Sequence, residues 1–588
     1  MKSRMPLADF LADYLRRIGV THLFGIPGDL VLRLFARLGE RRGFRIVTLS
    51  HEPAVGFAAD GYARATGRLA VACVTYGAGG LNMVNAVAGA FAEHVPVLVV
   101  SGGPGTEERK LGTLIHHQAR EIESQLRIYR EVTADARVLE DPRTAAESID
   151  QVVRTMWREQ RPGYLEIHRD MVERLIDVPR ALVDNQRPLE FARSDPRKVR
   201  EAARHTAARL ARARNPVVMV GIETFRFKLE KDVIELCERL GAPVMTTVLS
   251  KGAVPMDHPL YMGVHMGPMS PPAIRRRVDE ADLVVNLGTL LTDMNLGSRP
   301  PTIMRDKSVW AVNNRVNVSF HTYTDVVLRD FVRALLDSDL KRHHETIAYH
   351  DNLPPAPAWL ASLTGAHPGA SRGAKAGREP AARRAGVRRA IRVADVLHTL
   401  NAFLRGRRNY AVVAESGDML FAGLDVRIGG RAAYFAQGYY ASMGFGVPGA
   451  LGVQLGTGKR PIILCGDGSF QMTGTEISHA PRLGLAPIVL VMNNGGWGIF
   501  RPVVKRQSIL EIPEWPYAAL GSLLGGSGTR VTTGPELYAA LEAAERSPRF
   551  HLIEVIIDKD DLSPVSRKYI RASTRQMSNP AGRGAPRA

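Results

Sequence analysis

Cysteine and aromatic residues are scarce in this chain. Three of its 588 residues are cysteines, Cys73, Cys237 and Cys465, and 6% are aromatic. The cysteines are too few and too widely spaced for a disulfide framework or a CxxC metal motif. Unpaired cysteines fit a reducing compartment, so we expect a cytoplasmic protein.

Long hydrophobic runs are also missing. No stretch reaches the roughly 20 apolar residues of a membrane span without a charge or a break. The first residues, MKSRMPLADFLADYL, include Asp9 and Asp13 and hold no long apolar core, which argues against a secretory signal. We therefore expect no membrane partner.

Acidic side chains are nearly absent from two segments that carry most of the net charge of +19. Residues 341–392 contain ten Lys and Arg against three Asp and Glu, and residues 567–588 contain six against none. Their composition, rich in Gly, Ala, Pro and Arg, predicts flexible and solvated segments. The remainder is only mildly basic, so we expect no nucleic-acid partner. The alternative, a basic nucleic-acid-binding protein, predicts binding that disappears when both segments are removed.

What the chain does contain is a repeated alternation of helical and strand-like segments. Short apolar runs such as 70–75, 216–221 and 461–465 end in Gly, Pro or small polar residues, and helical patterns such as 7–18 separate them. Continuous apolar strands between helices are typical of parallel sheets covered on both faces. We therefore predict an α/β protein with three doubly wound parallel-sheet domains. The expected divisions are a first domain at 1–185, a middle domain at 195–345, a flexible basic linker at 350–388, a third domain at 389–570 and a basic tail at 571–588.

Polar residues stand at the ends of two neighbouring predicted strands in the third domain. Asp467 lies in a Gly-Asp-Gly turn after one strand, and Asn494 follows the next strand along the chain. Parallel sheets bind ligands beyond the carboxyl ends of their strands. Asp and Asn oxygens suit Mg²⁺, which completes its shell with phosphate oxygens, and a helix beginning at Ser469 suits a phosphate. The pattern predicts a metal–diphosphate site, although Gly-Asp-Gly alone is usually a simple turn.

Four polar side chains in the first domain stand at or near predicted turns, loops or helix starts. Glu52 begins a predicted helix after a predicted strand, where an acid usually interacts with the helix dipole. Asp29 lies in the turn GIPGD, a common position for Asp. His116 and His117 are adjacent in a loop, where a polar surface pair is the simpler interpretation. No third residue has metal-ligand spacing to this pair, so we do not expect zinc.

Several longer phrases resemble the thiamine-diphosphate-dependent 2-oxo-acid decarboxylases, most of all the bacterial phenylpyruvate and indolepyruvate decarboxylases. They are FGIPGD, SHEPAVGFAADGYAR, VTYGAG, LIHHQ, GYYASMGFGVP and GDGSFQMTG, the last followed by the Asn-Asn pair. The resemblance covers nearly the whole chain outside the linker and tail. It implies a carboxy-lyase that converts a 2-oxo acid, with an aryl pyruvate favoured, to an aldehyde and CO₂ through the ylide of thiamine diphosphate.

The resemblance implies catalytic roles for the first-domain residues. Glu52 would activate the cofactor bound by a partner subunit, which requires a homodimer, and a homotetramer is usual in the family. Asp29, His116 and His117 would manage protons, and their presence favours decarboxylation over ligation.

The resemblance also implies the residues that hold the cofactor and its metal. The Mg²⁺ ligands would be Asp467, the Asn494 side chain and the Gly496 carbonyl. The cofactor contacts would be Glu52, Thr75, Gly417, Asp418, the Ala441 carbonyl, Met443, Gly466, Gly468, Ser469 and Phe470.

The chain departs from pyruvate decarboxylases six residues after Asn494, where Phe500 replaces their Glu. The phenylpyruvate-type relatives also carry an apolar side chain there, so the change leaves activity possible but the proton donor open. Trp497 and Phe500 either shape an aryl pocket or pack their own loop, and Thr75 and Asp293 are further pocket candidates. Two alternatives stay open: an acetolactate-synthase-like carboligase and a catalytically weak thiamine-diphosphate-binding relative.

Overall fold

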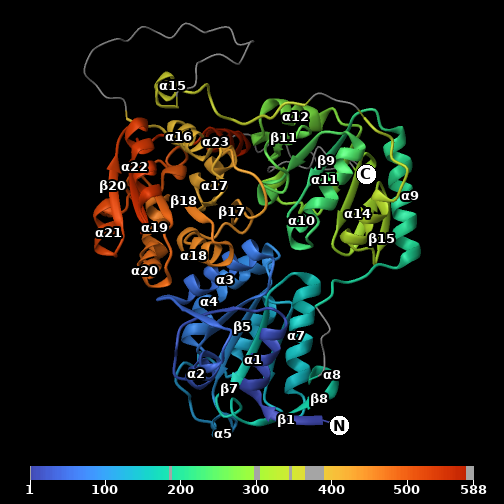
Figure 1. Ribbon diagram of the computed structural model, residues 1–588, viewed down its shortest axis with the longest axis vertical. Helices are drawn as coiled ribbons and strands as arrows, with labels where there is room; N and C mark the ends of the chain where they lie inside the picture. Colours follow the sequence, from blue (N-terminus) through green and yellow to red (C-terminus); the bar gives the residue numbers. More distant parts are fainter. Residues whose placement is uncertain (1, 184–188, 297–304, 344–346, 365–389, 578–588) are drawn as a thin grey trace.

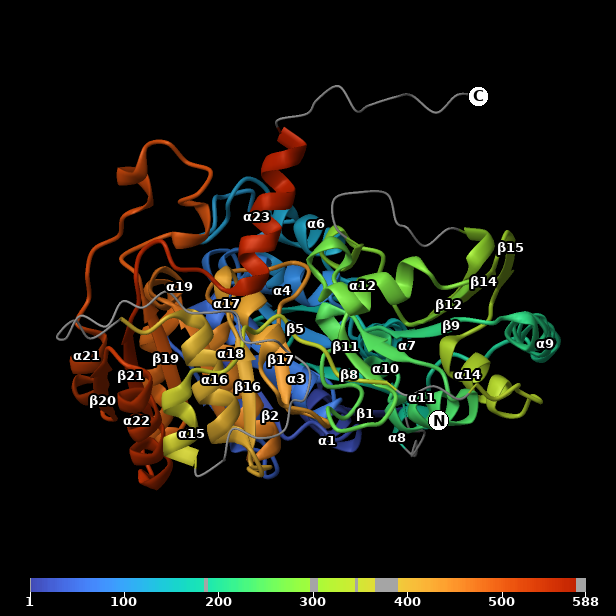
Figure 2. The same cartoon turned by 90° about the horizontal axis from the view of Figure 1, so that it is seen from above.

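Three α/β domains make up the part of the chain that the structure, a computed structural model, describes: residues 2–183, 189–296, 305–343, 347–364 and 390–577. Figure 1 shows a triangular arrangement, with the N-terminal domain (blue) below the middle domain (green) and the C-terminal domain (orange and red). Figure 2 shows the middle and C-terminal sheets side by side. The predicted α/β class with three sheet domains is confirmed. No helix within the described ranges has both the length and the apolar character needed to cross a membrane.

The N-terminal domain is built on a six-stranded parallel sheet. Its strands are β2 (His22–Gly25), β3 (Arg45–Thr48), β4 (Ala70–Val74), β5 (Val97–Gly103), β6 (Asp135–Leu139) and β7 (Gly163–His168), in the order β3-β2-β4-β5-β7-β6. An antiparallel pair, β1 (Lys2–Pro6) and β8 (Leu175–Pro179), lies apart from this sheet. The helices are α1 (Leu7–Arg17), α2 (Leu32–Glu40), α3 (Glu52–Thr66), α4 (Ala78–Ala92), α5 (Thr106–Lys110), α6 (Ser124–Glu131), α7 (Ala145–Glu159) and α8 (Arg180–Val183).

The middle domain has a seven-stranded sheet that is only partly parallel. Its strands are β9 (Pro216–Val220), β10 (Val244–Thr246), β11 (Tyr261–Val264), β12 (Leu283–Leu287), β13 (Ser308–Val312), β14 (Arg315–Val318) and β15 (His321–Thr324), in the order β11-β10-β9-β12-β13-β14-β15. The last two strands pair antiparallel, an extension that the prediction of parallel sheets missed. The helices are α9 (Pro196–Arg212), α10 (Glu223–Arg226), α11 (Glu230–Leu240), α12 (Pro272–Asp279), α13 (Asp293–Leu296) and α14 (Leu328–Leu336).

The C-terminal domain returns to a six-stranded parallel sheet. Its strands are β16 (Tyr410–Ala414), β17 (Tyr434–Ala436), β18 (Arg460–Gly466), β19 (Ile488–Asn493), β20 (Ser527–Val531) and β21 (His551–Ile556), in the order β17-β16-β18-β19-β21-β20. The helices are α16 (Val393–Leu404), α17 (Asp418–Ala422), α18 (Gly446–Thr457), α19 (Asp467–Thr473), α20 (Ala480–Leu483), α21 (Tyr517–Leu523), α22 (Gly534–Arg546) and α23 (Pro564–Met577). Because β18 and β19 are parallel neighbours, their carboxyl ends bring Asp467 and Asn494 to one edge of the sheet.

Helices α3 and α18 pack closely at the junction of the N-terminal and C-terminal domains (Figure 1). Gly61 lies against the carbonyl oxygen of Gly449, and Gly452 lies against that of Ala58. An added Cβ would stand only 2.2 and 2.0 Å from these oxygens, so the small residues are what allows the helices to approach. The packing fixes the helix that begins at Glu52 against the helix that follows GYYASMGF.

The described part of each predicted flexible basic segment contains a helix. Within the predicted linker, residues 358–364 form α15 (Ala358–Thr364), and Asn352 donates two hydrogen bonds to Asp425, at 3.0 and 3.2 Å. Helix α23 runs past the predicted tail boundary at 571, and its Tyr569 stacks on Phe421. The apolar spacing of this helix outweighs the excess of positive charge on which the prediction depended. The rest of the predicted linker and tail lies outside the described residues.

Candidate functional site

Asp467 begins α19 at the carboxyl end of β18 and is almost fully buried. Its Oδ1 accepts a hydrogen bond from the Gly468 N–H at 2.8 Å, and its Oδ2 accepts from the N–H groups of Gly496 at 3.0 Å and Asn494 at 3.2 Å. Burial raises the pKa of this carboxyl, and these N–H groups only partly offset the effect. Within the described residues no cationic side chain bonds to it, so the carboxylate is suited to a bound cation.

The loop after β19 supplies two more oxygen atoms beside Asp467. The Asn494 side-chain oxygen accepts a hydrogen bond from the Gly496 N–H at 3.3 Å. The Gly496 carbonyl accepts from the Gly498 N–H at 2.9 Å and keeps a second lone pair. Carboxylate, amide and carbonyl oxygens at one sheet edge are the donor set that Mg²⁺ prefers, so the residues present fit this ion.

Glycines leave open space around this oxygen cluster. Gly417, Gly466 and Gly495 have no neighbouring atom where a Cβ would stand, which leaves room for a diphosphate. Gly468 is different, because the ring of Trp497 lies against it. This contact packs the Trp497 ring, from the loop after β19, against the start of α19.

Asp418 lies in the predicted diphosphate loop, but its carboxylate is already engaged. It accepts hydrogen bonds from the backbone N–H of Ser563 at 3.0 Å and from its hydroxyl at 2.6 Å. The side chain thus connects α17 to the segment leading into α23. A contact between Asp418 and a diphosphate would have to come from its backbone.

Residues 437–444, which we call the cofactor segment, connect β17 to α18. Ala441 has a positive φ of 55°, a conformation that non-glycine residues rarely adopt, and the Ala441 and Met443 side chains are partly exposed. The nearby Ser469 and Phe470 are buried, and the Phe470 ring packs edge-on against Tyr517. Met443 can therefore contact a ligand through its side chain, whereas Phe470 belongs to the core.

Glu52 is the first residue of α3, directly after the turn that follows β3, as predicted. Its Oε2 accepts a hydrogen bond of 2.7 Å from the side-chain amide of Asn82 on α4, and it is only partly buried. Asn82 was not predicted as a site residue, because nothing in the local sequence indicates that the two helices meet there.

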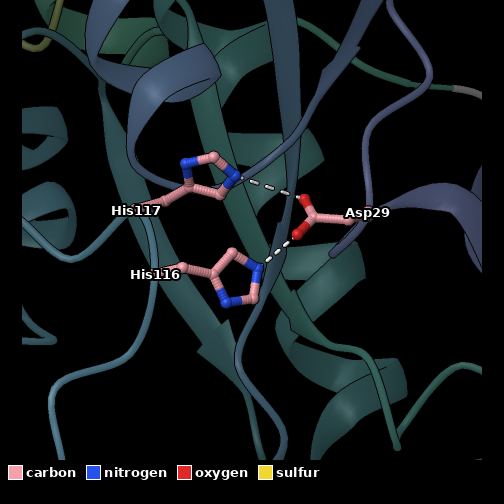
Figure 3. A group of neighbouring side chains, drawn as sticks. All are labelled: Asp29, His116 and His117. Atoms are coloured by element: carbon pink, nitrogen blue, oxygen red, sulfur yellow. Dashed lines mark hydrogen bonds and ion pairs between the residues drawn. The ribbon is translucent and has the colours of Figure 1, made fainter.

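Asp29, His116 and His117 form one group, with both imidazoles pointing at the carboxylate (Figure 3). His116 Nε2 bonds to Asp29 Oδ2, and His117 Nε2 lies 3.5 Å from Asp29 Oδ1. The hydroxyl of Thr75, after β4, donates to Asp29 Oδ1 at 3.1 Å. The structure therefore brings together four residues that the sequence placed in three separate motifs.

The carboxylate of Asp29 is the charged centre of this group. Burial acts to raise the pKa of Asp29, but hydrogen bonds from His116, the Leu30 N–H and Thr75 outweigh it and lower the pKa below its ordinary value. A charged Asp29 can hold protons on the Nε2 atoms of both histidines. The three side chains also lie close enough to share one ion, which corrects the expectation that the pair has no third ligand.

The buried side-chain amide of Gln125 supports the turn at Gly77, which lies between the group around Asp29 and helix α4. Gln125 accepts a hydrogen bond from the Gly77 N–H at 2.7 Å and donates to the Tyr164 hydroxyl at 2.6 Å. Gly77 has a φ of 64°, and a Cβ there would lie 1.9 Å from the carbonyl oxygen of His117. Gln125 thus fixes the backbone against which His117 rests, a role that the sequence did not indicate.

Two predicted pocket residues are exposed. Asp293 is exposed at the start of α13 in the middle domain, and its carboxylate bonds the N–H of its neighbour Met294 at 2.9 Å. Phe500 is 51% exposed at the end of a 3₁₀ turn, η6 (Gly498–Phe500). Its ring is thus free to contact a ligand, whereas Asp293 has no bond to the other candidate residues in the described parts of the chain.

The candidate residues form two separate clusters within one chain. Glu52 and the group around Asp29 belong to the N-terminal domain, and the oxygen cluster around Asp467 belongs to the C-terminal domain. Among the described residues, no hydrogen bond or ion pair joins the two clusters.

The three-domain fold, the oxygen atoms beside open glycines and the glutamate at a helix start fit a thiamine-diphosphate enzyme. Comparison with family models agrees. Thiamine pyrophosphate enzyme models match for the N-terminal TPP binding domain at residues 5–128, the central domain at 203–338 and the C-terminal TPP binding domain at 417–555. The chain belongs to this family, in the branch of the 2-oxo-acid decarboxylases.

Individual relatives are similar along almost their full length. An indole-3-pyruvate decarboxylase from Azospirillum brasilense is 37% identical over 584 residues, covering 98% of this chain and all of the relative. Pyruvate decarboxylase isozyme 3 from Saccharomyces cerevisiae is 28% identical, with 88% of each chain covered. Pyruvate decarboxylase 3 from Oryza sativa subsp. indica is 28% identical, covering 95% of this chain and 92% of the relative.

Proposed function

We propose that the protein decarboxylates an aryl-substituted 2-oxo acid, such as phenylpyruvate or indolepyruvate, to the aldehyde and CO₂, using thiamine diphosphate and Mg²⁺. The grouping of Asp29, His116 and His117 beside Thr75 carries this proposal, because it puts proton donors at the carboxyl end of a parallel sheet. The similarity to an indole-3-pyruvate decarboxylase favours an aryl substrate. The three cysteines of this chain are buried and unpaired, which fits a protein of the reducing cytoplasm.

The C-terminal domain would hold the cofactor. Asp467, Asn494 and the Gly496 carbonyl would bind Mg²⁺, and Gly417 and Gly466 would border the diphosphate. The Ala441 carbonyl and Met443 would contact the pyrimidine. When bound, thiamine diphosphate would supply the electron sink for the electron pair of the carbon–carbon bond that breaks as CO₂ leaves.

The N-terminal domain would manage the protons. Glu52, held by Asn82, presents a carboxyl oxygen that can exchange a proton with the pyrimidine. His116 and His117 can deliver a proton to the carbon that has lost CO₂, and Asp29 orients their imidazole rings.

A second copy of the chain would complete the site. Among the residues that the structure describes, no hydrogen bond or ion pair joins the two clusters, and each cluster contains part of the required groups. Tyr439 and Tyr440, in the cofactor segment, are 42% and 40% exposed, and Met472, beside Gly444, is 49% exposed. We propose that these apolar side chains are covered in a homodimer whose partner supplies Glu52.

One assay tests the proposal. The purified chain with Mg²⁺ and thiamine diphosphate should release aldehyde from phenylpyruvate and indolepyruvate, read through a coupled reductase. Chelation of Mg²⁺ should abolish the signal. Release of 2-hydroxy ketones in place of aldehyde would favour a carboligase, and no product from any aryl or branched 2-oxo acid would refute the proposed activity.

The exposed ring of Phe500 allows the aryl preference to be tested. We expect Phe500→Ala to lower kcat/KM for phenylpyruvate roughly tenfold, because an aromatic contact contributes about 1–3 kcal/mol, and to leave pyruvate little affected. Ile509→Ala is the matched control, since Ile509 is another exposed apolar side chain in the following loop. Equal losses for both substrates would mean that Phe500 only packs its loop.

A further inference from the structure

Glu93, directly after α4, is a fully buried carboxylate that bonds to the cofactor segment. Its Oε1 accepts hydrogen bonds from the backbone N–H groups of Tyr439 at 2.7 Å and Tyr440 at 2.9 Å. Glu93 is 346 residues away from Tyr439 in sequence, so the contact joins the N-terminal domain to the C-terminal domain. The two N–H groups stand immediately before Ala441, whose φ is positive.

Two arginines bond to Glu93, one at its carboxylate and one at its backbone carbonyl. Arg64, in the last turn of α3, donates to Glu93 Oε2 at 2.8 Å and also bonds to Asp60. Arg226, from the middle domain, donates to the Glu93 backbone carbonyl at 3.3 and 3.2 Å. Burial lowers the pKa of Arg226 to about 9, so it stays protonated at neutral pH. Within this buried cluster the two acids, Asp60 and Glu93, match the two arginines in number. All three domains contribute residues to it or bond to it.

Asn85 adds a second attachment from the same helix. Its side-chain amide donates to the Ser442 hydroxyl at 2.7 Å, and the Ser442 backbone carbonyl accepts from the Ser416 hydroxyl at 3.1 Å. Glu93 therefore holds the backbone before Ala441, and Asn85 holds the residue after it. One turn earlier on α4, Asn82 bonds to Glu52.

We propose that α4 positions the cofactor segment through Glu93 and Asn85, so that the Ala441 carbonyl and the Met443 side chain are presented to the pyrimidine. Neither residue touches the reacting atoms. Glu93 acts through the backbone N–H groups of Tyr439 and Tyr440, and Asn85 acts through the Ser442 hydroxyl. The inference rests on the proposed function, because that function assigns the pyrimidine contacts to this segment.

The test is cofactor affinity, with the full-length chain and fixed Mg²⁺. Glu93→Gln keeps the shape of the side chain but replaces one accepting oxygen with an NH₂ donor. This NH₂ group must face either Arg64 or the backbone N–H groups of Tyr439 and Tyr440, which are donors themselves, so one of these hydrogen bonds is lost. We expect the Kd for thiamine diphosphate, measured by tryptophan fluorescence quenching, to rise by about tenfold or more. At saturating cofactor, kcat should fall while the KM for the 2-oxo acid stays within about twofold, because substrate groups are not moved. Asn85→Ala should raise the cofactor Kd in the same direction by a smaller factor.

The matched control is Asp282→Asn in the middle domain. Asp282 also accepts two consecutive backbone N–H groups, those of Arg214 at 2.7 Å and Asn215 at 2.9 Å, but it lies outside the cofactor segment. It should lower the melting temperature without changing the cofactor Kd. If Glu93→Gln does not fold, Asn85→Ala decides, because Asn85 is exposed in the chain and its loss is easily tolerated.

The outcomes separate this inference from the proposed function. A wild-type chain that binds thiamine diphosphate while the Glu93→Gln and Asn85→Ala chains bind it equally well overturns the positioning role alone. A wild-type chain that does not bind the cofactor overturns both. A raised Kd in the two variants with an unchanged Kd in the control supports it.

Discussion

Replacing Glu52 with Gln should lower kcat by roughly a thousandfold, the size of effect expected when a proton-transferring side chain is lost. Glu52 begins α3, and its carboxylate is oriented by Asn82 at 2.7 Å. Gln keeps the hydrogen bond from Asn82, because its carbonyl oxygen can still accept, but it cannot exchange a proton with the pyrimidine. The variant should therefore fold normally and bind thiamine diphosphate with a Kd within a few fold of wild type. Steady-state kinetics and fluorescence titration on the same preparation measure the two quantities.

A control separates proton transfer from the interaction of an acid with a helix dipole. Glu147 lies in the first turn of α7 and is exposed, so Glu147→Gln removes an acid from a comparable helix position. Its activity should match wild type, since a surface dipole interaction affects only stability, by roughly 0.3–1 kcal/mol. Full activity in the Glu52→Gln enzyme would refute the catalytic role, and loss of cofactor binding would show that Glu52 mainly holds the cofactor.

Local sequence patterns predicted the strands and the positions of the polar residues at their ends. The predicted run 216–221 is β9 (Pro216–Val220), and Glu52 begins its helix as expected. Continuous apolar runs are informative because a buried parallel strand has no polar face. Residues at strand ends are informative because parallel topology brings them to one edge.

Contacts between distant segments could not be predicted in this way. Asp418 was expected at the diphosphate, but its carboxylate bonds to Ser563, 145 residues further on. Glu93 and Gln125 have no local signal, because their partners are backbone N–H groups of other segments. The grouping of Asp29 with His116 and His117 followed from a family resemblance, since the spacing of 87 residues carries no information by itself.

Charge composition was the least reliable guide. The basic stretch from Arg567 was expected to be flexible, yet its residues 567–577 lie in α23, where Val565 is buried and Tyr569 packs against the C-terminal core. Arg and Lys are good helix formers, and two apolar residues four positions apart are enough to attach one helix face. Net charge describes solvation and does not exclude a helix.

Replacing Asp467 with Asn should remove the stabilisation that Mg²⁺ and thiamine diphosphate give the wild-type chain. At a cofactor concentration about 100 times its Kd, wild type should gain roughly 2.7 kcal/mol of stability, seen as a higher melting temperature. The variant should gain little, because the amide is neutral and the cation loses its only charged ligand among the described residues. Without metal and cofactor, the two chains should melt within a few degrees of each other. The Asp467 carboxylate accepts three backbone hydrogen bonds, and the amide oxygen of Asn can still accept two of them. Differential scanning fluorimetry with and without the ligands measures this.

Asp425→Asn is the matched control for the effect of burial. Asp425 lies in the same domain, is also almost fully buried and accepts a backbone hydrogen bond, from the Asn352 N–H at 3.0 Å. Burial raises the pKa of Asp425 to about 6, so both substitutions neutralise a buried acid. The control should keep the ligand-induced rise in melting temperature, and chelation of Mg²⁺ from wild type should reproduce the behaviour of Asp467→Asn. A full ligand-induced rise in the Asp467→Asn chain would exclude Asp467 as a metal ligand, because a neutral amide cannot replace a carboxylate on Mg²⁺ without loss of affinity.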